Sequence, residues 1–346
     1  MPVKQKILHI IYSGLGGTSA YAFNLIIADK SNIYTHEILF YGIEDIPTAQ
    51  YEKAKLLAHS VYFIKKTQGI DIKSRKAVLA LLKKQTPNVI TLHVNSIIVE
   101  CSLYKQAKLI FVEHQSNQLK TKKEWVWSVI AQLKADFVVS LSRSYNSEIK
   151  RYTRLFYQKN KNKIIKTGID LDVYQSTYPR NNDKLKIGVV SRINNFRDHE
   201  TLLKAFNSIE GGDLYIAGDG PLKHSLEVKY ISKNIHWLGL LSENEVIKLL
   251  SELDIFVMAS FGETNSIALM QAQASKLPII ACNVKGINNI LSSKYCVYVE
   301  PENIDDYRTA IKKLLADKNK RQELSEASYN FALQNLSNKD MFKAYS

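Results

Sequence analysis

Short apolar runs alternate with amphipathic stretches along almost the whole chain. A short apolar run bounded by polar or glycine residues is typical of a buried strand, and apolar positions three and four apart are typical of a helix. In the first half, strands are expected at residues 7–12, 36–41, 89–94, 109–113, 137–141 and 164–167. Helices are expected up to residue 28 and at residues 47–60, 71–85 and 125–134. Strands that alternate with helices predict a parallel sheet covered on both faces.

The pattern is interrupted once and then starts again. Residues 172–183 are polar and include Pro179, which indicates a linker. Further strands are expected at residues 186–190, 214–217, 235–238, 255–258, 278–281 and 297–299. Helices are expected at residues 200–209, 243–253 and 267–275, and residues 304–345 are expected to be mostly helical. We therefore predict two Rossmann-like, doubly wound α/β domains, residues 1–173 and 174–328, with a last helix at about 329–346 that packs back on the first domain.

Residues 258–280 contain the most suggestive strand-to-helix junction. An apolar strand ends at the polar stretch 260–266, and a helix is expected to start at Ile267. The free N–H groups and the positive dipole end of a helix N-terminus favour an anionic ligand. Glu263 and Gln271 lie eight residues apart on either side of the helix start. Such a loop is more often simply solvated, so the junction alone does not establish a site.

The formal net charge of +14 is concentrated in the first half. Residues 1–173 contain 26 Lys and Arg against 13 Asp and Glu, whereas residues 174–346 contain 21 against 20. Residues 150–166 are basic and contain no acid. The charge can simply keep the surface solvated, but its asymmetry indicates a polyanionic partner for the first domain. No nucleic-acid-binding motif accompanies it, so an anionic membrane surface is favoured over nucleic acid.

The cysteines and the hydropathy indicate the compartment. Cys101, Cys282 and Cys296 are far apart and lack metal-ligand spacing, so they are interpreted as reduced core residues of a cytoplasmic protein. No apolar run approaches the roughly 20 residues of a membrane-spanning helix. No cluster of His, Cys and Asp has the spacing of a metal site, so neither a metal nor another cofactor is expected.

Three further groups of residues are candidates for ligand binding. Gly16 and Gly17 follow the first strand, where glycine lets the backbone approach a phosphate or sugar, although the dinucleotide fingerprint is incomplete. Arg192 and Arg197 lie five apart after the first strand of the second domain, and two guanidinium groups suit a diphosphate. His93 and His114 both end strands, and His114 is favoured because it follows a strongly apolar run.

The order of these motifs resembles the retaining, nucleotide-sugar-dependent glycosyltransferases of group 1, family 4, which have the GT-B fold. The resemblance covers nearly the whole chain and rests on several segments together. These segments are Gly16-Gly17, His114, residues 135–142, residues 163–174, Arg192 with Arg197, residues 214–227 with Gly218, residues 235–246, the Glu-x7-Gln stretch at residues 262–280, and residues 284–291. The resemblance implies two Rossmann-like domains that face an interdomain cleft.

The resemblance also implies roles for individual residues. Arg192 and Arg197 would hold the donor diphosphate without a metal, and Glu263 would contact the donor sugar. His114 would line the reacting face. The remaining substrate-binding positions would be Gly16, Gly17, Gly218, Thr264, Asn265, Ser266, Ile267 and Gln271.

The implied activity is retaining transfer of a sugar, with UDP as the commonest carrier. The acceptor would be a glycan or a lipid-linked molecule in surface polysaccharide, lipopolysaccharide or glycolipid synthesis, at the inner face of the plasma membrane. Gln271, Thr167 and Asn289 depart from the family's usual Glu, Asn and Glu. Three alternatives remain: a nucleotide-sugar 2-epimerase of the same fold, a non-catalytic GT-B subunit that binds a partner transferase, which Gln271 makes plausible, and a nucleic-acid-binding protein suggested by charge alone.

Overall fold

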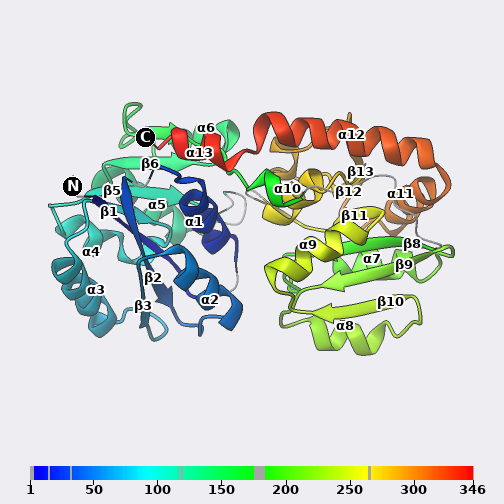
Figure 1. Ribbon diagram of the computed structural model, residues 1–346, viewed down its shortest axis with the longest axis horizontal. Helices are drawn as coiled ribbons and strands as arrows, with labels where there is room; N and C mark the ends of the chain where they lie inside the picture. Colours follow the sequence, from blue (N-terminus) through cyan, green and yellow to red (C-terminus); the bar gives the residue numbers. More distant parts are fainter. Residues whose placement is uncertain are drawn as a thin grey trace. The chain divides into compact units, whose positions relative to one another are not determined.

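The computed structural model describes residues 4–14, 16–31, 33–115, 117, 120–174, 184–263 and 266–345. The chain divides into two compact units (Figure 1). Unit 1 comprises Met1–Gly168 and Asn338–Ser346, and unit 2 comprises Ile169–Ser337. Each unit has a parallel sheet with helices, which confirms the predicted pair of doubly wound α/β domains.

The sheet of unit 1 is parallel throughout, in the order β3-β2-β1-β4-β5-β6-β7. Its strands are β1 (Gln5–Tyr12), β2 (Tyr34–Gly42), β3 (Ser60–Lys65), β4 (Val89–Leu92), β5 (Lys108–Glu113), β6 (Phe137–Ser140) and β7 (Asn162–Ile164). The strand order reverses between β1 and β4. In a doubly wound sheet, the carboxyl ends of the strands at this reversal form the usual ligand-binding edge.

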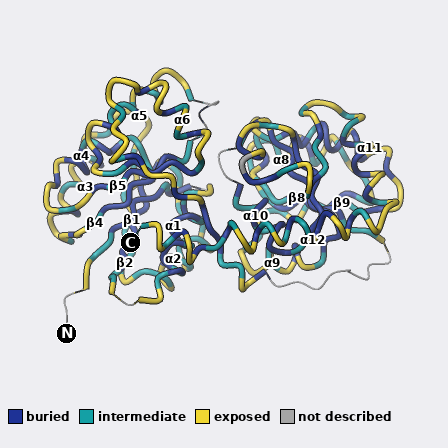
Figure 2. The backbone as a smooth tube through the Cα atoms, turned by 90° about the horizontal axis from the view of Figure 1, so that it is seen from above, coloured by how far each residue is buried: buried dark blue, intermediate teal, exposed yellow. Residues whose placement is uncertain are grey.

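The helices of unit 1 complete the alternation. They are α1 (Gly17–Ala28), α2 (Thr48–Leu57), α3 (Ile72–Gln85), α4 (Ile98–Leu103), α5 (Lys122–Lys134), α6 (Arg143–Tyr152) and α13 (Asn338–Lys343). The central strands are buried on both faces, as Figure 2 shows for β1 and its neighbours. Such burial explains why these strands appear in the sequence as continuous apolar runs.

Unit 2 repeats the topology in the order β10-β9-β8-β11-β12-β13. Its strands are β8 (Leu185–Val190), β9 (Gly212–Ala217), β10 (Ile235–Gly239), β11 (Ile255–Met258), β12 (Ile279–Cys282) and β13 (Val297–Val299). Its helices are α7 (His199–Phe206), α8 (Lys223–Lys229), α9 (Glu243–Glu252), α10 (Ile267–Ala274), α11 (Ile304–Ala316) and α12 (Lys318–Asn335), and Leu171–Tyr174 forms the short 3-10 helix η3. The strand order reverses between β8 and β11, which defines the ligand-binding edge of this unit.

The limits of the units differ slightly from the sequence-based division. Unit 2 begins at Ile169 rather than at residue 174, because Ile169 and Tyr174 are buried in its hydrophobic core. The helix expected at about 329–346 is divided in two. The backbone N–H of Ile169 donates to the Leu336 carbonyl over 2.8 Å, after which α13 belongs to unit 1. The strand expected at 164–167 lies earlier, at β7, and residues 175–183 of the linker lie outside the described residues.

Candidate functional site

An ion pair joins two of the predicted site residues at the reversal edge of unit 2. Arg197 lies in the loop after β8, and Glu263 lies in the loop after β11. The Arg197 Nη2 atom is 2.7 Å from Glu263 Oε1, and Arg197 Nη1 donates to Ser260 Oγ over 2.7 Å. Because β8 and β11 are neighbouring parallel strands, their carboxyl ends bring these loops together.

Burial shapes the electrostatics of this pair. The Glu263 side chain is 11% exposed and that of Arg197 is 20% exposed. Burial raises the pKa of the Glu263 carboxyl, and the positive charge of Arg197 opposes this rise. A partly dehydrated arginine at the end of a central strand can bind an anion more strongly than a fully solvated one.

A hydrogen bond joins the two ends of the loop that carries both predicted arginines. His199 Nε2 lies 2.9 Å from Ser191 Oγ, so a hydrogen bond joins the first residue after β8 to the start of α7. Burial, together with the positive charge of nearby Arg197, lowers the pKa of His199 to about 4. Arg192 lies on the same loop and is exposed. The structure therefore brings Arg197 to Glu263 and places Arg192 on the outer part of the same loop.

The helix after Glu263 begins as expected. Ser266 is the N-cap of α10, and its Oγ accepts a hydrogen bond from the Leu269 backbone N–H over 3.4 Å. Ile267 is the first residue of the helix. Thr264 and Asn265 lie outside the described residues.

Gly218 has a structural reason for being glycine. It follows β9 with a φ of 142°, in a region that favours glycine, and an added Cβ atom would lie 1.9 Å from the Ser191 carbonyl oxygen. Its lack of a side chain therefore lets the end of β9 lie directly against the loop that leads to Arg192. Gly16 lies in the corresponding loop of unit 1, where an added Cβ atom would meet open space.

Gln271 bonds to a residue that the sequence did not suggest. Its Nε2 donates to the Tyr174 hydroxyl over 2.7 Å, which ties α10 to η3 within unit 2. Burial raises the pKa of the Tyr174 hydroxyl well above its ordinary value. Gln271 itself is half-buried. The linker position of Tyr174 gave no signal that could have predicted this contact.

Unit 1 contains a pocket of about 420 Å³ at its own reversal edge. The loops after β1, β2, β4 and β5 contribute to its wall. Its lining includes the aromatic side chains Tyr12, Tyr41 and Phe111 and the polar residues His93, His114 and Gln115. Gly16 also lines the pocket. Two of the residues predicted to bind substrate, Gly16 and His114, thus share one cavity.

His114 is paired with His93 in this pocket. His93 Nδ1 lies 2.7 Å from His114 Nε2, and both rings pack against Tyr21, with centroids 5.6 and 5.0 Å away. Burial lowers the pKa of His114 to about 3 and that of His93 well below its ordinary value. Both rings are therefore neutral near pH 7, and one proton lies between the two facing nitrogens.

The shared proton determines the chemistry of the pair. In one tautomer of the pair, His93 Nδ1 donates to His114 Nε2, and the other ring nitrogen of His93, Nε2, is an acceptor. In the other tautomer, His114 Nε2 donates to His93 Nδ1, and His93 Nε2 carries a proton and is a donor. His93 Nε2 is buried without a hydrogen-bond partner among the described residues. A buried polar atom without a partner on the wall of a pocket is suited to bind a hydroxyl group. The sequence pattern identified His93 as a strand-end residue but could not show that it meets His114.

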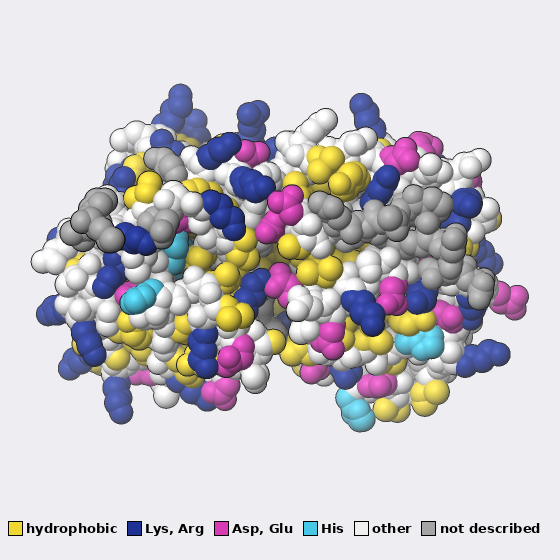
Figure 3. All heavy atoms as spheres, viewed as in Figure 1, with side chains coloured by type: hydrophobic (Ala, Val, Ile, Leu, Met, Phe, Trp, Pro, Cys, Tyr) yellow, Lys and Arg dark blue, Asp and Glu magenta, His cyan; other side chains and the backbone are white. Residues whose placement is uncertain are grey.

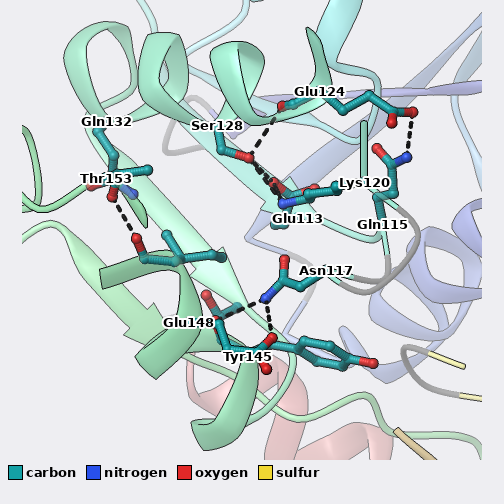
Figure 4. A network of polar contacts seen from close by, with 12 residues as sticks. Glu113, Gln115, Asn117, Lys120, Glu124, Ser128, Gln132, Tyr145, Glu148 and Thr153 are labelled. Carbon is teal, nitrogen blue, oxygen red and sulfur yellow. Dashed lines mark hydrogen bonds and ion pairs between the residues drawn. The ribbon is translucent and has the colours of Figure 1, made fainter. Parts of the chain in front are cut away.

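A buried ion pair anchors the loop that carries His114 (Figure 4). Lys120 Nζ lies 2.8 Å from Glu113 Oε2, and the two side chains are 1% and 9% exposed. Ser128 Oγ on α5 also donates to Glu113 Oε2 over 3.0 Å. Gln115, which lines the pocket, donates to Glu124. These contacts fix both sides of His114 to β5 and α5.

Two structural features are absent from the part of the chain that the structure describes. There, no group of three or more His, Cys, Asp and Glu side chains is arranged to hold a metal ion. Nor does any helix within the same ranges combine the length and apolar character needed to cross a membrane.

Comparisons with known proteins show which proteins this chain is similar to. Residues 172–331 match the family described as Glycosyl transferases group 1. An uncharacterized glycosyltransferase of Methanocaldococcus jannaschii is 24% identical over 268 residues, which are 70% of this chain and 68% of that protein. A UDP-Gal:alpha-D-GlcNAc-diphosphoundecaprenol alpha-1,3-galactosyltransferase of Escherichia coli is 29% identical over 118 residues, which are 32% of this chain and 30% of that protein.

The similarity of fold extends over the whole chain. The crystal structure of HepE from Anabaena in complex with UDP and glucose superimposes with a TM-score of 0.80 at 13% identity, covering 99% of this chain and 98% of HepE. Several curated relatives are matched over a small part of their length, 28% for one and 27% for another. The family match covers most of unit 2, which contains Arg197, Glu263 and Gln271. Residues 172–331, a little less than half of the chain, therefore match the group 1 glycosyltransferases, and both units have the GT-B architecture.

Proposed function

We propose that this protein is a retaining glycosyltransferase that moves a sugar from a UDP-sugar to a glycan or lipid-linked acceptor. The observation that carries the proposal is the Arg197–Glu263 pair at the reversal edge of unit 2. It combines a cation for a diphosphate with a carboxylate for sugar hydroxyls, within the segment that matches the family. HepE, which has the same fold, binds UDP and glucose.

In this proposal, the donor binds to unit 2 without a metal ion. Arg192 and Arg197 hold the diphosphate, together with the N–H groups of Ser266 and Ile267 at the start of α10. The diphosphate competes with Glu263 for Arg197, and Glu263 then accepts hydrogen bonds from the sugar. Gln271 faces the ribose hydroxyls, donating through its amide and accepting through its carbonyl oxygen.

The proposed reaction is a substitution on one face of the sugar. The bond from the anomeric carbon to the phosphate oxygen breaks, and both of its electrons leave with the nucleotide. The acceptor oxygen bonds to the anomeric carbon on the same face, and its proton passes to the leaving phosphate. The arginines stabilise the charge that develops on this phosphate, which is a preorganised electrostatic contribution to catalysis. Glu263 serves as a hydrogen-bond acceptor and not as a nucleophile, unlike the second carboxylate of retaining glycosidases.

Unit 1 is proposed to bind the acceptor in the pocket at His93 and His114. Neutral imidazoles and aromatic walls suit hydroxyl groups and sugar faces. The excess of basic residues in the first half of the chain favours an anionic or lipid-linked acceptor at the inner face of a membrane. The galactosyltransferase relative is named for a diphosphoundecaprenol-linked acceptor. We therefore place the reaction in the synthesis of a surface polysaccharide, lipopolysaccharide or glycolipid.

A panel of nucleotide sugars tests the donor assignment. The protein is heated with UDP-, GDP-, ADP- and CMP-sugars, and a rise in melting temperature identifies the donor. A donor hit is then incubated with candidate acceptors in EDTA, and the anomeric configuration of the product is determined by NMR. An inverted product would refute the retaining mechanism, and a loss of activity in EDTA would refute metal independence.

A non-catalytic subunit is the second candidate, and the Gln271–Tyr174 hydrogen bond favours it. A neutral side chain already bonded to η3 holds a ribose less strongly than a free carboxylate would. This candidate predicts nucleotide binding without hydrolysis or transfer. Incubating the donor without acceptor separates both candidates from a 2-epimerase, which alone would convert the sugar into its epimer.

A further inference from the structure

We infer that unit 1 docks on an anionic lipid bilayer through one surface built from the end of α6 and the turn after it. We define this α6-turn surface by the apolar residues Tyr152, Leu155 and Phe156 and the basic residues Lys150, Arg151, Arg154 and Lys159. The inference extends the membrane location in the proposed function to a particular surface, and it does not depend on the donor chemistry.

Large apolar side chains are unusually exposed on this surface. Leu155 is 89% exposed, Tyr152 is 61% exposed and Phe156 is 39% exposed. They lie within five consecutive residues that connect α6 to β7, the edge strand of the sheet. A single exposed leucine is ordinary, whereas a contiguous apolar group surrounded by polar residues is typical of a binding surface.

Basic residues predominate around the apolar group, although Glu148 precedes it on α6 and Glu124 lies in the first turn of α5. Residues 150–166 contain seven Lys and Arg and no Asp or Glu. Within the described part of the chain, neither Arg151 nor Arg154 takes part in an ion pair with an acid. Lys and Arg side chains project from the margin of unit 1 on which Figure 1 shows α6, as the space-filling view shows (Figure 3). Their charge remains available to a partner.

A neighbouring helix enlarges the surface. The rings of Trp125 on α5 and Tyr152 on α6 contact each other in a tilted arrangement, with centroids 4.2 Å apart, which places the first turn of α5 beside the end of α6. That turn contributes the exposed residues Lys122 and Lys123, and Val126 there is 57% exposed. The surface therefore has apolar side chains with basic side chains on both sides.

A lipid bilayer fits this composition better than nucleic acid. Anionic headgroups attract the basic side chains, while the aliphatic Leu155 and the aromatic rings enter the boundary between headgroups and acyl chains. Nucleic acid would use the charge and the aromatic rings but would leave Leu155 in water. An aliphatic side chain at the most exposed point of a basic surface is therefore the feature that selects lipid.

The test compares two leucine substitutions in one unit. Leu155→Glu places an acid on the α6-turn surface, and Leu56→Glu makes the same change on α2, where Leu56 is 87% exposed. Helix α2 packs near β3, at the opposite edge of the sheet from β7. The two variants therefore have the same net charge and lose similarly exposed side chains.

Binding is measured by flotation with vesicles of phosphatidylcholine alone or with a third of phosphatidylglycerol. We expect the wild-type protein to bind only the anionic vesicles and to be released near 1 M salt, where the screening length is about 3 Å. Leu155→Glu should weaken binding about tenfold or more, and Leu56→Glu should leave it within about twofold. Arg151→Gln and Arg154→Gln should each weaken it about fivefold.

Several outcomes would overturn the inference. The inference is wrong if Leu155→Glu binds anionic vesicles as well as the wild type does, or if the two leucine variants weaken binding equally. It is also wrong if the wild-type protein binds neutral vesicles as well as anionic ones. Binding to single-stranded RNA that Leu155→Glu leaves intact, without vesicle binding, would assign the surface to nucleic acid. Thermal unfolding of each variant verifies that it is folded. UDP titrations on the same samples test the donor assignment separately, so either proposal can fail alone.

Discussion

The two units have the same order of strands around the reversal, yet their ligand-binding edges differ in charge. At the β1/β4 edge of unit 1, the loops present two neutral histidines to a pocket. At the β8/β11 edge of unit 2, the loops present the Arg197–Glu263 ion pair. The difference shows that this topology provides only a place for a ligand. The residues that follow each strand decide whether that place suits hydroxyl groups or phosphate charge.

Burial acts on the titratable side chains at both edges, because it disfavours the charged form of a side chain. In unit 1, it holds the pKa of each histidine low and keeps the rings uncharged. In unit 2, it raises the pKa of Glu263, and the guanidinium of Arg197 opposes this rise. Four experiments test this contrast between the two units.

Acid should destabilise unit 1 before unit 2. His9, His93 and His114 are buried with lowered pKa values, so the stability they contribute is present above the unfolded-state pKa near 6.5 and is lost as pH falls below it. For His114 the loss continues to about pH 3. Each such histidine contributes a slope of about 1.4 kcal/mol per pH unit in the free energy of unfolding.

Unit 2 should respond differently to the same change. His199 is its comparable group, with a pKa of about 4. The raised pKa of Glu263 acts with the opposite sign: the stability it contributes is present below pH 4.5 and is lost as pH rises through its folded pKa. Hydrogen exchange between pH 7 and 4 should therefore show the strands of unit 1 losing protection first. Earlier loss in unit 2 would contradict the contrast in buried charge.

Removal of either arginine should nearly abolish turnover. Arg192→Ala and Arg197→Ala should each lower kcat about 10²-fold, as loss of one charge-stabilising donor typically does. Arg197→Ala should also raise the pKa of Glu263, since it removes the one effect that lowers it. Initial rates with the identified donor measure the effect, with the variant Arg308→Ala on α11 as control. Near-wild-type rates would refute the assignment of the diphosphate to this edge.

Loss of His93 should change the tautomer of His114. His93→Phe removes Nδ1, the partner of His114 Nε2, and should lower kcat up to about tenfold, the equivalent of one hydrogen bond. The ¹⁵N chemical shifts of His114 report the tautomer, and donor affinity at unit 2 should not change. His93→Asn can still donate to His114 and should recover part of the rate. An unchanged His114 spectrum would show that the pair has no positioning role.

Gln271→Glu should have the smallest effect. A glutamate can accept a hydrogen bond from the Tyr174 hydroxyl, in place of the one that Gln271 donates to it. Its charge also strengthens hydrogen bonds to ribose hydroxyls. Donor affinity measured by calorimetry should stay the same or rise a few-fold. The exposed substitution Gln322→Glu on α12 controls for the added charge. A large loss of affinity would show that Gln271 does not face the ribose.

Elements that are strongly patterned were predictable, and weakly patterned ones were not. Buried strands such as β1 and β11 are continuous apolar runs, so their positions followed from the sequence. The edge strand β3 was missed because none of its residues is buried. Helix α6 was missed as well, since it is largely polar. These elements form because the rest of the unit provides a surface to pack on, which no local pattern records.

The candidate site divides in the same way. The sequence alone determined the two α/β units, the strand ends where ligand-binding loops follow, and the residue types that such loops need. Only the tertiary structure decided that His93 meets His114, that Arg197 pairs with Glu263, and that Gln271 reaches Tyr174 across 97 residues. The physical reason is that parallel strands connected by helices bring loops distant in sequence to one edge. Which side-chain atoms then come into contact depends on the packing within each unit, and no single sequence motif determines that packing.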